Sequence, residues 1–93
     1  MLLLLSLFAC GPTGDADNGA VLYADKCVAC HGDDGKLGLE TDGEPAADLT
    51  RETAELSEEQ LVKVIMDGKG TMPAQYADEQ DAYDVAAYMK ATF

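Results

Sequence analysis

Histidine and basic residues are scarce in this chain of 93 residues, and their scarcity excludes several classes of function. His31 is the only histidine, and Lys and Arg number 6 against 18 Asp and Glu, for a formal net charge of −12. A chain this acidic should not bind nucleic acid, whose phosphates require a basic surface. A structural zinc site needs four ligands, usually cysteine or histidine. The chain has only 3 cysteines for such a site, and Cys10 lies in a segment with another expected role.

The chain also lacks an apolar run long enough to cross a membrane. Its longest apolar run, MLLLLSLFA at residues 1–9, is followed by Cys10 and Gly11. It is too short to span a bilayer as a helix, which needs roughly 20 residues, but it suits a secretory signal peptide. Leu7-Phe8-Ala9-Cys10 resembles the lipobox of bacterial lipoproteins, although Phe8 and the absence of a basic n-region depart from it. We expect a lipoprotein-type signal at 1–9, either incomplete or with its true start further upstream, and Cys10 lipidated. The alternative is an ordinary secretory signal that leaves Cys10 as a stray thiol.

The motif Cys27-Val28-Ala29-Cys30-His31 has the spacing that attaches haem covalently. On a helix, Cys27 and Cys30 lie on one face, where both sulfurs can reach the two vinyl groups of one porphyrin. His31 follows on the same side, where its imidazole can bind the iron. A redox-active Cys-x-x-Cys would instead need strand–helix–strand context, and no strand-like run flanks the motif. The motif predicts one covalent haem c, attached at Cys27 and Cys30, with His31 as an iron ligand.

The domain organisation follows from these two motifs. A single domain of this size has a marginal apolar core, so the haem would form the centre of the fold. Residues 10–18 are rich in Gly and Asp and predict a flexible tether, and residues 19–93 form the domain. Two cysteines bind haem and one binds lipid, which leaves none for a disulfide. Haem attachment on the oxidising side of the membrane agrees with export.

Three helices are readable, and no convincing strand. The first runs from Asp17 or Asn18 to Ala29. The second begins at Ser57 with a Ser-x-x-Gln capping box and ends at Gly68, and the third runs from near Asp78 to Thr92. Residues 32–50 read as an irregular loop. The carboxylates of Asp33, Asp34, Glu40 and Asp42 in this loop lack the spacing of an EF-hand, so we interpret it as a solvated polar loop and not as a calcium site.

The second iron ligand is sought among three methionines. Met66 and Met89 fall inside predicted helices, where a methionine is usually core filler. Met72 lies in the loop Gly68-Lys69-Gly70-Thr71-Met72-Pro73, whose glycines let the backbone approach closely and whose proline restricts the chain after the methionine. We therefore expect Met72 to be the second axial ligand.

The haem motif, the three helices and the Met72-Pro73 loop occur in an order that resembles the small class I c-type cytochromes, over residues 17–93. The resemblance implies an all-α cytochrome c fold, with three main helices wrapped around one covalent haem. It implies that Gly19, Tyr23 and Tyr88 pack the first helix against the last. It also implies a proline whose carbonyl accepts a hydrogen bond from the histidine ring. Pro45 is the only candidate, but Ala47 could equally occupy that position.

The expected function is one-electron transfer between membrane-associated or periplasmic redox partners, and not enzymatic catalysis. An enzyme such as a peroxidase would need an open iron position and an adjacent acid–base group. A gas or redox sensor, in which Met72 dissociates, is the remaining alternative. The negative charge suggests partners with basic docking surfaces, or else simply a well-solvated surface. We expect a monomer on the periplasmic side of a bacterial membrane, anchored through Cys10.

Overall fold

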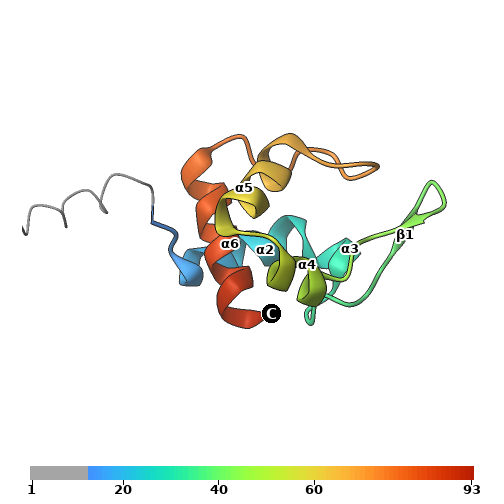
Figure 1. Ribbon diagram of the computed structural model, residues 1–93, viewed down its shortest axis with the longest axis horizontal. Coiled ribbons are helices and arrows are strands. Elements are labelled where there is room, and N and C mark those ends of the chain that lie inside the picture. Colours follow the sequence, from blue (N-terminus) through green and yellow to red (C-terminus); the bar gives the residue numbers. More distant parts are fainter. Residues whose placement is uncertain (1–12) are drawn as a thin grey trace, which may run out of the picture.

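A computed structural model describes residues 13–93 (Figure 1). The predicted signal peptide and Cys10 lie outside this range. The described helices are α2 (Ala16–Lys26), α3 (Val28–His31), α4 (Leu49–Glu55), α5 (Glu58–Asp67) and α6 (Glu79–Thr92), and two short antiparallel strands are β1 (Glu40–Thr41) and β2 (Glu44–Pro45). The fold is mostly helical, which confirms the predicted class. No helix in this range has both the length and the apolar character needed to cross a bilayer.

Helices α2 and α6 cross at close range, and Gly19 makes the approach possible. A Cβ atom at Gly19 would lie 1.9 Å from the carbonyl oxygen of Asp84 on α6, so no larger residue fits without separating the helices. Beside the crossing, Tyr23 packs on Tyr88 and Phe93, with ring centroids 5.3 and 5.6 Å away. The structure therefore has Gly19, Tyr23 and Tyr88 at the contact between first and last helices.

Helix α5 has the boundaries that its sequence predicts. The Ser57 hydroxyl accepts a hydrogen bond from the amide of Gln60, while the Gln60 side chain accepts one from the amide of Ser57. This capping box satisfies two amides that the first helical turn leaves without partners. Gly68, with φ +84°, ends the helix. Leu61 and Ile65 are buried on its inner face.

The first helix differs from its prediction at both ends. It begins at Ala16, because the Asp15 carboxylate caps the amides of Asp17 and Asn18. The last residues of the predicted tether, 16–18, are therefore helical. The predicted helix is also interrupted at Cys27, where φ is −108°, and α3 forms a separate turn after it.

The sequence prediction of an irregular segment at 32–50 missed the start of α4 and the strand pair. Only Leu49 and Thr53 of α4 are buried, so the helix has too few apolar residues to show a periodicity. Its position depends on α6, from which Lys90 donates hydrogen bonds to the carbonyls of Thr53 and Leu56. In the strand pair, Asp42 and Gly43 both have positive φ, the conformation of a two-residue Asp-Gly hairpin turn.

Candidate functional site

A cavity of about 550 Å³ lies between α3, the Met72 loop and the inner faces of α5 and α6. Its volume is within the range of small-molecule and cofactor sites. Five of the predicted site residues line it: Cys27, Cys30, His31, Met72 and Pro45. The remaining wall is largely apolar and includes Leu49, Leu61, Ile65, Val85 and Met89. In Figure 1 the loop after α5 and the α3 turn lie at the same end of the molecule, away from the N-terminal end of α2.

One helical turn presents the haem motif to this cavity. The amides of Cys30 and His31 both donate to the carbonyl of Cys27, at 3.2 and 3.0 Å. The thiol of Cys27 is buried, and burial, with the neighbouring Cys30 and Asp25, raises its pKa to about 11. The environment of Cys27 thus disfavours a charged thiolate. It suits a sulfur that becomes an uncharged thioether.

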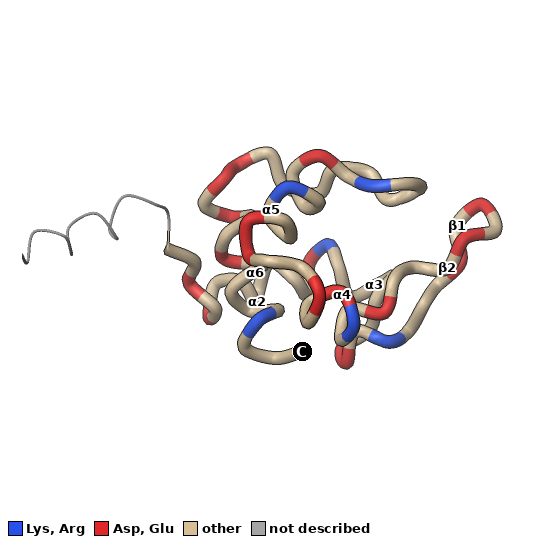
Figure 2. The backbone as a smooth tube through the Cα atoms, viewed as in Figure 1, with Lys and Arg blue, Asp and Glu red and all other residues tan. Residues whose placement is uncertain are grey.

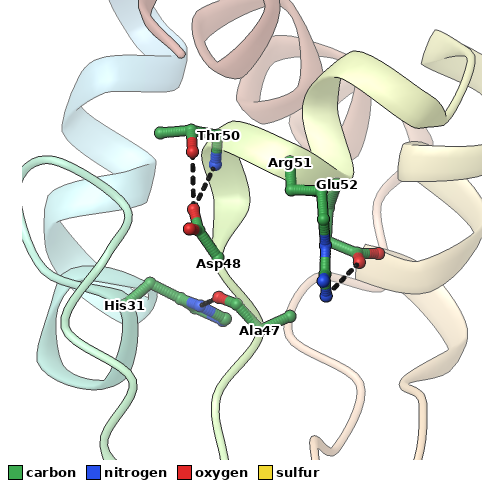
Figure 3. Close-up of polar contacts among 6 residues, drawn as sticks. All are labelled: His31, Ala47, Asp48, Thr50, Arg51 and Glu52. Atoms are coloured by element: carbon green, nitrogen blue, oxygen red, sulfur yellow. Dashed lines mark hydrogen bonds and ion pairs between the residues drawn. The ribbon is translucent and has the colours of Figure 1, made fainter.

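A backbone carbonyl orients the His31 ring. Nδ1 of His31 lies 3.1 Å from the carbonyl oxygen of Ala47, and because a carbonyl only accepts, Nδ1 carries the proton (Figure 3). The other ring nitrogen, Nε2, then keeps its lone pair for a metal. The expectation of Pro45 in this role is wrong. Pro45 belongs to β2, where it pairs with Glu40 in the exposed hairpin, and the chain reaches His31 only two residues later.

The start of α4 holds Ala47 in place. The Asp48 carboxylate caps α4 by accepting hydrogen bonds from the hydroxyl and the amide of Thr50, at 2.6 and 2.9 Å (Figure 3). These bonds keep the pKa of Asp48 below its usual value. On the other side of Ala47, the amide of Ala46 donates to the carbonyl of Leu39. The helix that the sequence prediction missed thus fixes the carbonyl that orients His31.

A tight turn carries Met72. The amides and carbonyls of Lys69 and Met72 form two reciprocal hydrogen bonds of 2.9 Å. Gly68 is required here, because a Cβ at this position would lie 2.6 Å from the carbonyl oxygen of Met72. Met66 does not line the cavity, whereas Met89, buried on α6, does. The geometry therefore reduces the methionine candidates to Met72 and Met89.

The donor set fits a haem. Two sulfurs spaced by one helical turn, an imidazole with one free nitrogen and a thioether share one apolar cavity, and this is the donor chemistry of His/Met-ligated c-type haem. These features define a class: proteins that hold a porphyrin covalently and transfer single electrons.

Comparisons with known proteins agree with this class. A family model described as "Cytochrome C oxidase, cbb3-type, subunit III" matches residues 14–89. Cytochrome c6 of Thermosynechococcus vestitus is 33% identical over 94 residues, covering 94% of this chain and 79% of that protein. Cytochrome c-551 of Bacillus subtilis is 28% identical over 74 residues, covering 80% of this chain and 61% of that protein. The chain therefore belongs to the cytochrome c family. Its cofactor is covalent haem c, and its class is electron transfer and not enzymatic catalysis.

Proposed function

We propose that this domain is a one-electron carrier in which Cys27 and Cys30 hold the haem and His31 and Met72 are the axial ligands of its iron. The supporting observation is that these four side chains, from α3 and from a distant loop, line one apolar cavity. When bound, haem c supplies an iron that cycles between Fe(II) and Fe(III).

The side chains of the chain set the properties of that iron. The hydrogen bond from His31 to Ala47 maintains the ring tautomer and raises the basicity of the coordinating nitrogen. The soft thioether of Met72 favours Fe(II), so we expect a raised reduction potential. The Ala47 carbonyl orients the His31 ring and the Lys69–Met72 turn holds the backbone of Met72, so we expect both ligands to stay in place in both oxidation states.

A redox titration of the purified holoprotein under anaerobic conditions, followed by visible spectra, tests this assignment. Met72→Leu should lower the reduction potential and let reduced iron bind carbon monoxide. Met89→Leu is the matched control, because Met89 lines the same cavity, and it should keep a six-coordinate spectrum. If Met89→Leu opens the iron and Met72→Leu does not, the ligand assignment is wrong. Tight carbon monoxide binding by the wild-type protein would favour a sensor over a carrier.

We also propose export and attachment to the membrane through a lipid on Cys10. The lipobox-like sequence at 7–10 supports this, as does the need for haem attachment on the oxidising side of the membrane. Cys10→Ser should move the protein from the membrane fraction to the soluble periplasmic fraction. A variant that stays with the membrane would contradict the lipid anchor.

The charge distribution suggests how partners approach. Asp and Glu are spread from residue 15 to residue 84 (Figure 2), yet among them only Glu44 and Glu52 line the cavity, together with Lys26 and Lys69. The cavity rim is thus balanced, while the protein as a whole is strongly negative. We propose that the overall field steers a basic partner over a distance, and that close contact at the rim depends little on charge. Rates of reduction by a cationic and an anionic metal complex, measured against ionic strength, test this.

A further inference from the structure

The segment just after Met72 is attached to α2 by two side chains. The hydroxyl of Tyr76 donates to the carbonyl of Leu22 on α2, at 2.8 Å. The ammonium of Lys26, in the last turn of α2, donates to the carbonyl of Gln75 at 3.2 Å and lies 4.8 Å from the centre of the Tyr76 ring. These contacts join the Met72 loop to the helix that ends immediately before Cys27.

The same segment is attached to α5 on its other side. The amides of Gln75 and Tyr76 both approach the carbonyl of Ile65, at 2.9 and 3.4 Å. Residues 75–76 are therefore held between α5 and α2, within four residues of Met72. The α5 contacts come from the backbone alone, whereas the α2 contacts depend on the side chains of Tyr76 and Lys26.

The hydroxyl of Tyr76 is not needed for packing, but it forms a hydrogen bond to helix α2. The side chain is 8% exposed, and a phenylalanine would fill the same space. A buried hydroxyl costs free energy unless it forms a hydrogen bond, and this one bonds to a carbonyl on a different element. Burial, with Asp25 nearby, raises the pKa of Tyr76, so the hydroxyl remains a donor at neutral pH.

We propose that Tyr76 and Lys26 are positioning residues that hold the Met72 loop against α2 and so keep the thioether at the iron. This inference rests on the proposed ligation by Met72. Loss of the contacts would increase the fraction of molecules in which Met72 has left the iron, while His31 and both thioether bonds remain in place. Carbon monoxide would report that fraction, because it competes with Met72 for the same coordination position.

The experiment measures carbon monoxide affinity of the reduced holoprotein for Tyr76→Phe, Lys26→Met and the double variant. Tyr76→Phe should raise the apparent affinity about two- to tenfold, the effect expected from one lost hydrogen bond. Lys26→Met should give a smaller increase, since its contacts are exposed. The double variant should show the largest increase.

Two controls remove the same groups elsewhere. Tyr83→Phe removes a hydroxyl from α6, and Lys63→Met removes an exposed charge from α5; neither side chain lines the cavity. Both should bind carbon monoxide as the wild type does. If Tyr76 is only a core residue, its phenylalanine variant will lose thermal stability and keep the wild-type affinity, which overturns the proposal. If Tyr76→Phe does not fold, the carbon monoxide affinity of Lys26→Met decides the proposal: an increase supports it, and the wild-type value contradicts it.

Met72→Leu separates this inference from the proposed ligation. If Met72→Leu opens the iron to carbon monoxide and the Tyr76 and Lys26 variants do not, the ligation stands and the positioning role fails. If Met72→Leu itself behaves as the wild type, Met72 is not the iron ligand, and the positioning proposal that rests on it is overturned as well.

Discussion

The α2–α6 crossing and the cavity side of the molecule are held together by different kinds of contact. At the crossing, backbone meets backbone at Gly19, and Ala82 and Ala86 of α6 are fully buried. On the cavity side, the segments 32–48 and 68–75 surround a space of about 550 Å³, and Leu37 and Leu39 are exposed. A large apolar cavity loses the dispersion contacts that a packed core would have. The crossing is thus a complete core, whereas the cavity side is completed by the haem.

Removing haem attachment should have the largest effect. Without haem, the apolar walls of the cavity face water, so Cys27→Ser combined with Cys30→Ser should leave the chain mostly unfolded. Any residual amide protection should be found in α2 and α6, and none in segments 32–48 and 68–75. Circular dichroism and hydrogen exchange measure this. If the chain without haem folded cooperatively and its amides were protected throughout, the cavity side would not depend on haem for its stability.

Gly19→Ala should break the other region. The added methyl would lie 1.9 Å from the carbonyl oxygen of Asp84, so α2 and α6 must separate, at a cost of about 3 kcal/mol, the upper end of overpacking penalties. Gly43→Ala is the matched control on the cavity side. Its Cβ meets no atom within 4 Å, so only the positive φ of +84° opposes it, at roughly 1–2 kcal/mol. Urea unfolding of the holoproteins measures both, and equal losses would contradict the difference between the regions.

Asp84 should give a smaller, pH-dependent effect at the crossing. Its buried carboxylate accepts hydrogen bonds from the amide of Asp15 and the side chains of Asn18 and Gln80, at 2.7 to 2.8 Å. Burial acts to raise the pKa of Asp84, but these bonds outweigh it and the pKa is lowered. In Asp84→Asn the new side-chain NH2 group would face groups that are themselves donors, so the variant should lose about 1–3 kcal/mol of unfolding free energy at pH 7.

The sign of the pH dependence follows from the lowered pKa. The ionised carboxylate stabilises the folded state above the unfolded-state pKa, about 3.9, and this stabilisation is lost as the pH falls through the lower folded-state value. The difference in unfolding free energy between wild type and Asp84→Asn should stay constant from neutral pH down to about pH 5, then shrink. A difference that grows in acid would show that the hydrogen bonds are not the cause.

The smallest expected effect is the difference between removing the N-cap of α5, Ser57, and removing the N-cap of α4, Asp48. Ser57→Ala removes the cap of α5 and should cost about 1 kcal/mol, with no change at the haem. Asp48→Ala removes the cap of α4, next to the carbonyl that orients His31, and should also shift the reduction potential. Urea unfolding and redox titration of both variants test this. If Ser57→Ala shifted the reduction potential by the same amount, the claim that the α4 cap acts on His31 would be wrong.

The success of the sequence prediction varied with the range of the interactions. The capping box at Ser57 and the end of α5 at Gly68 were predicted because each depends on neighbours in the chain. Helix α4 was missed because Leu49 is its only large apolar residue, and because the contact that holds its end comes from Lys90 on the distant helix α6. The Asp42-Gly43 turn does have a signal in the sequence, because an Asp-Gly pair favours a two-residue hairpin turn.

Asp84 makes a structural contact that no local pattern could reveal. In the sequence it is one carboxylate among 18, on a helix whose first turn already carries Glu79 and Asp81. Only the fold brings it to the amide of Asp15, 69 residues away, and buries it there. The same holds for Tyr76, whose partner Leu22 is 54 residues away.

By itself, the sequence determined the class of cofactor, because two cysteines and a histidine within five residues can be brought to one side by a single helical turn. Tertiary structure decided that Ala47 and not Pro45 accepts the hydrogen bond of His31, and that Met66 lies outside the cavity. Local spacing determines which atoms of one turn lie together. Which distant carbonyl or thioether meets them depends on how the whole chain packs, and that information is spread over many weak contacts.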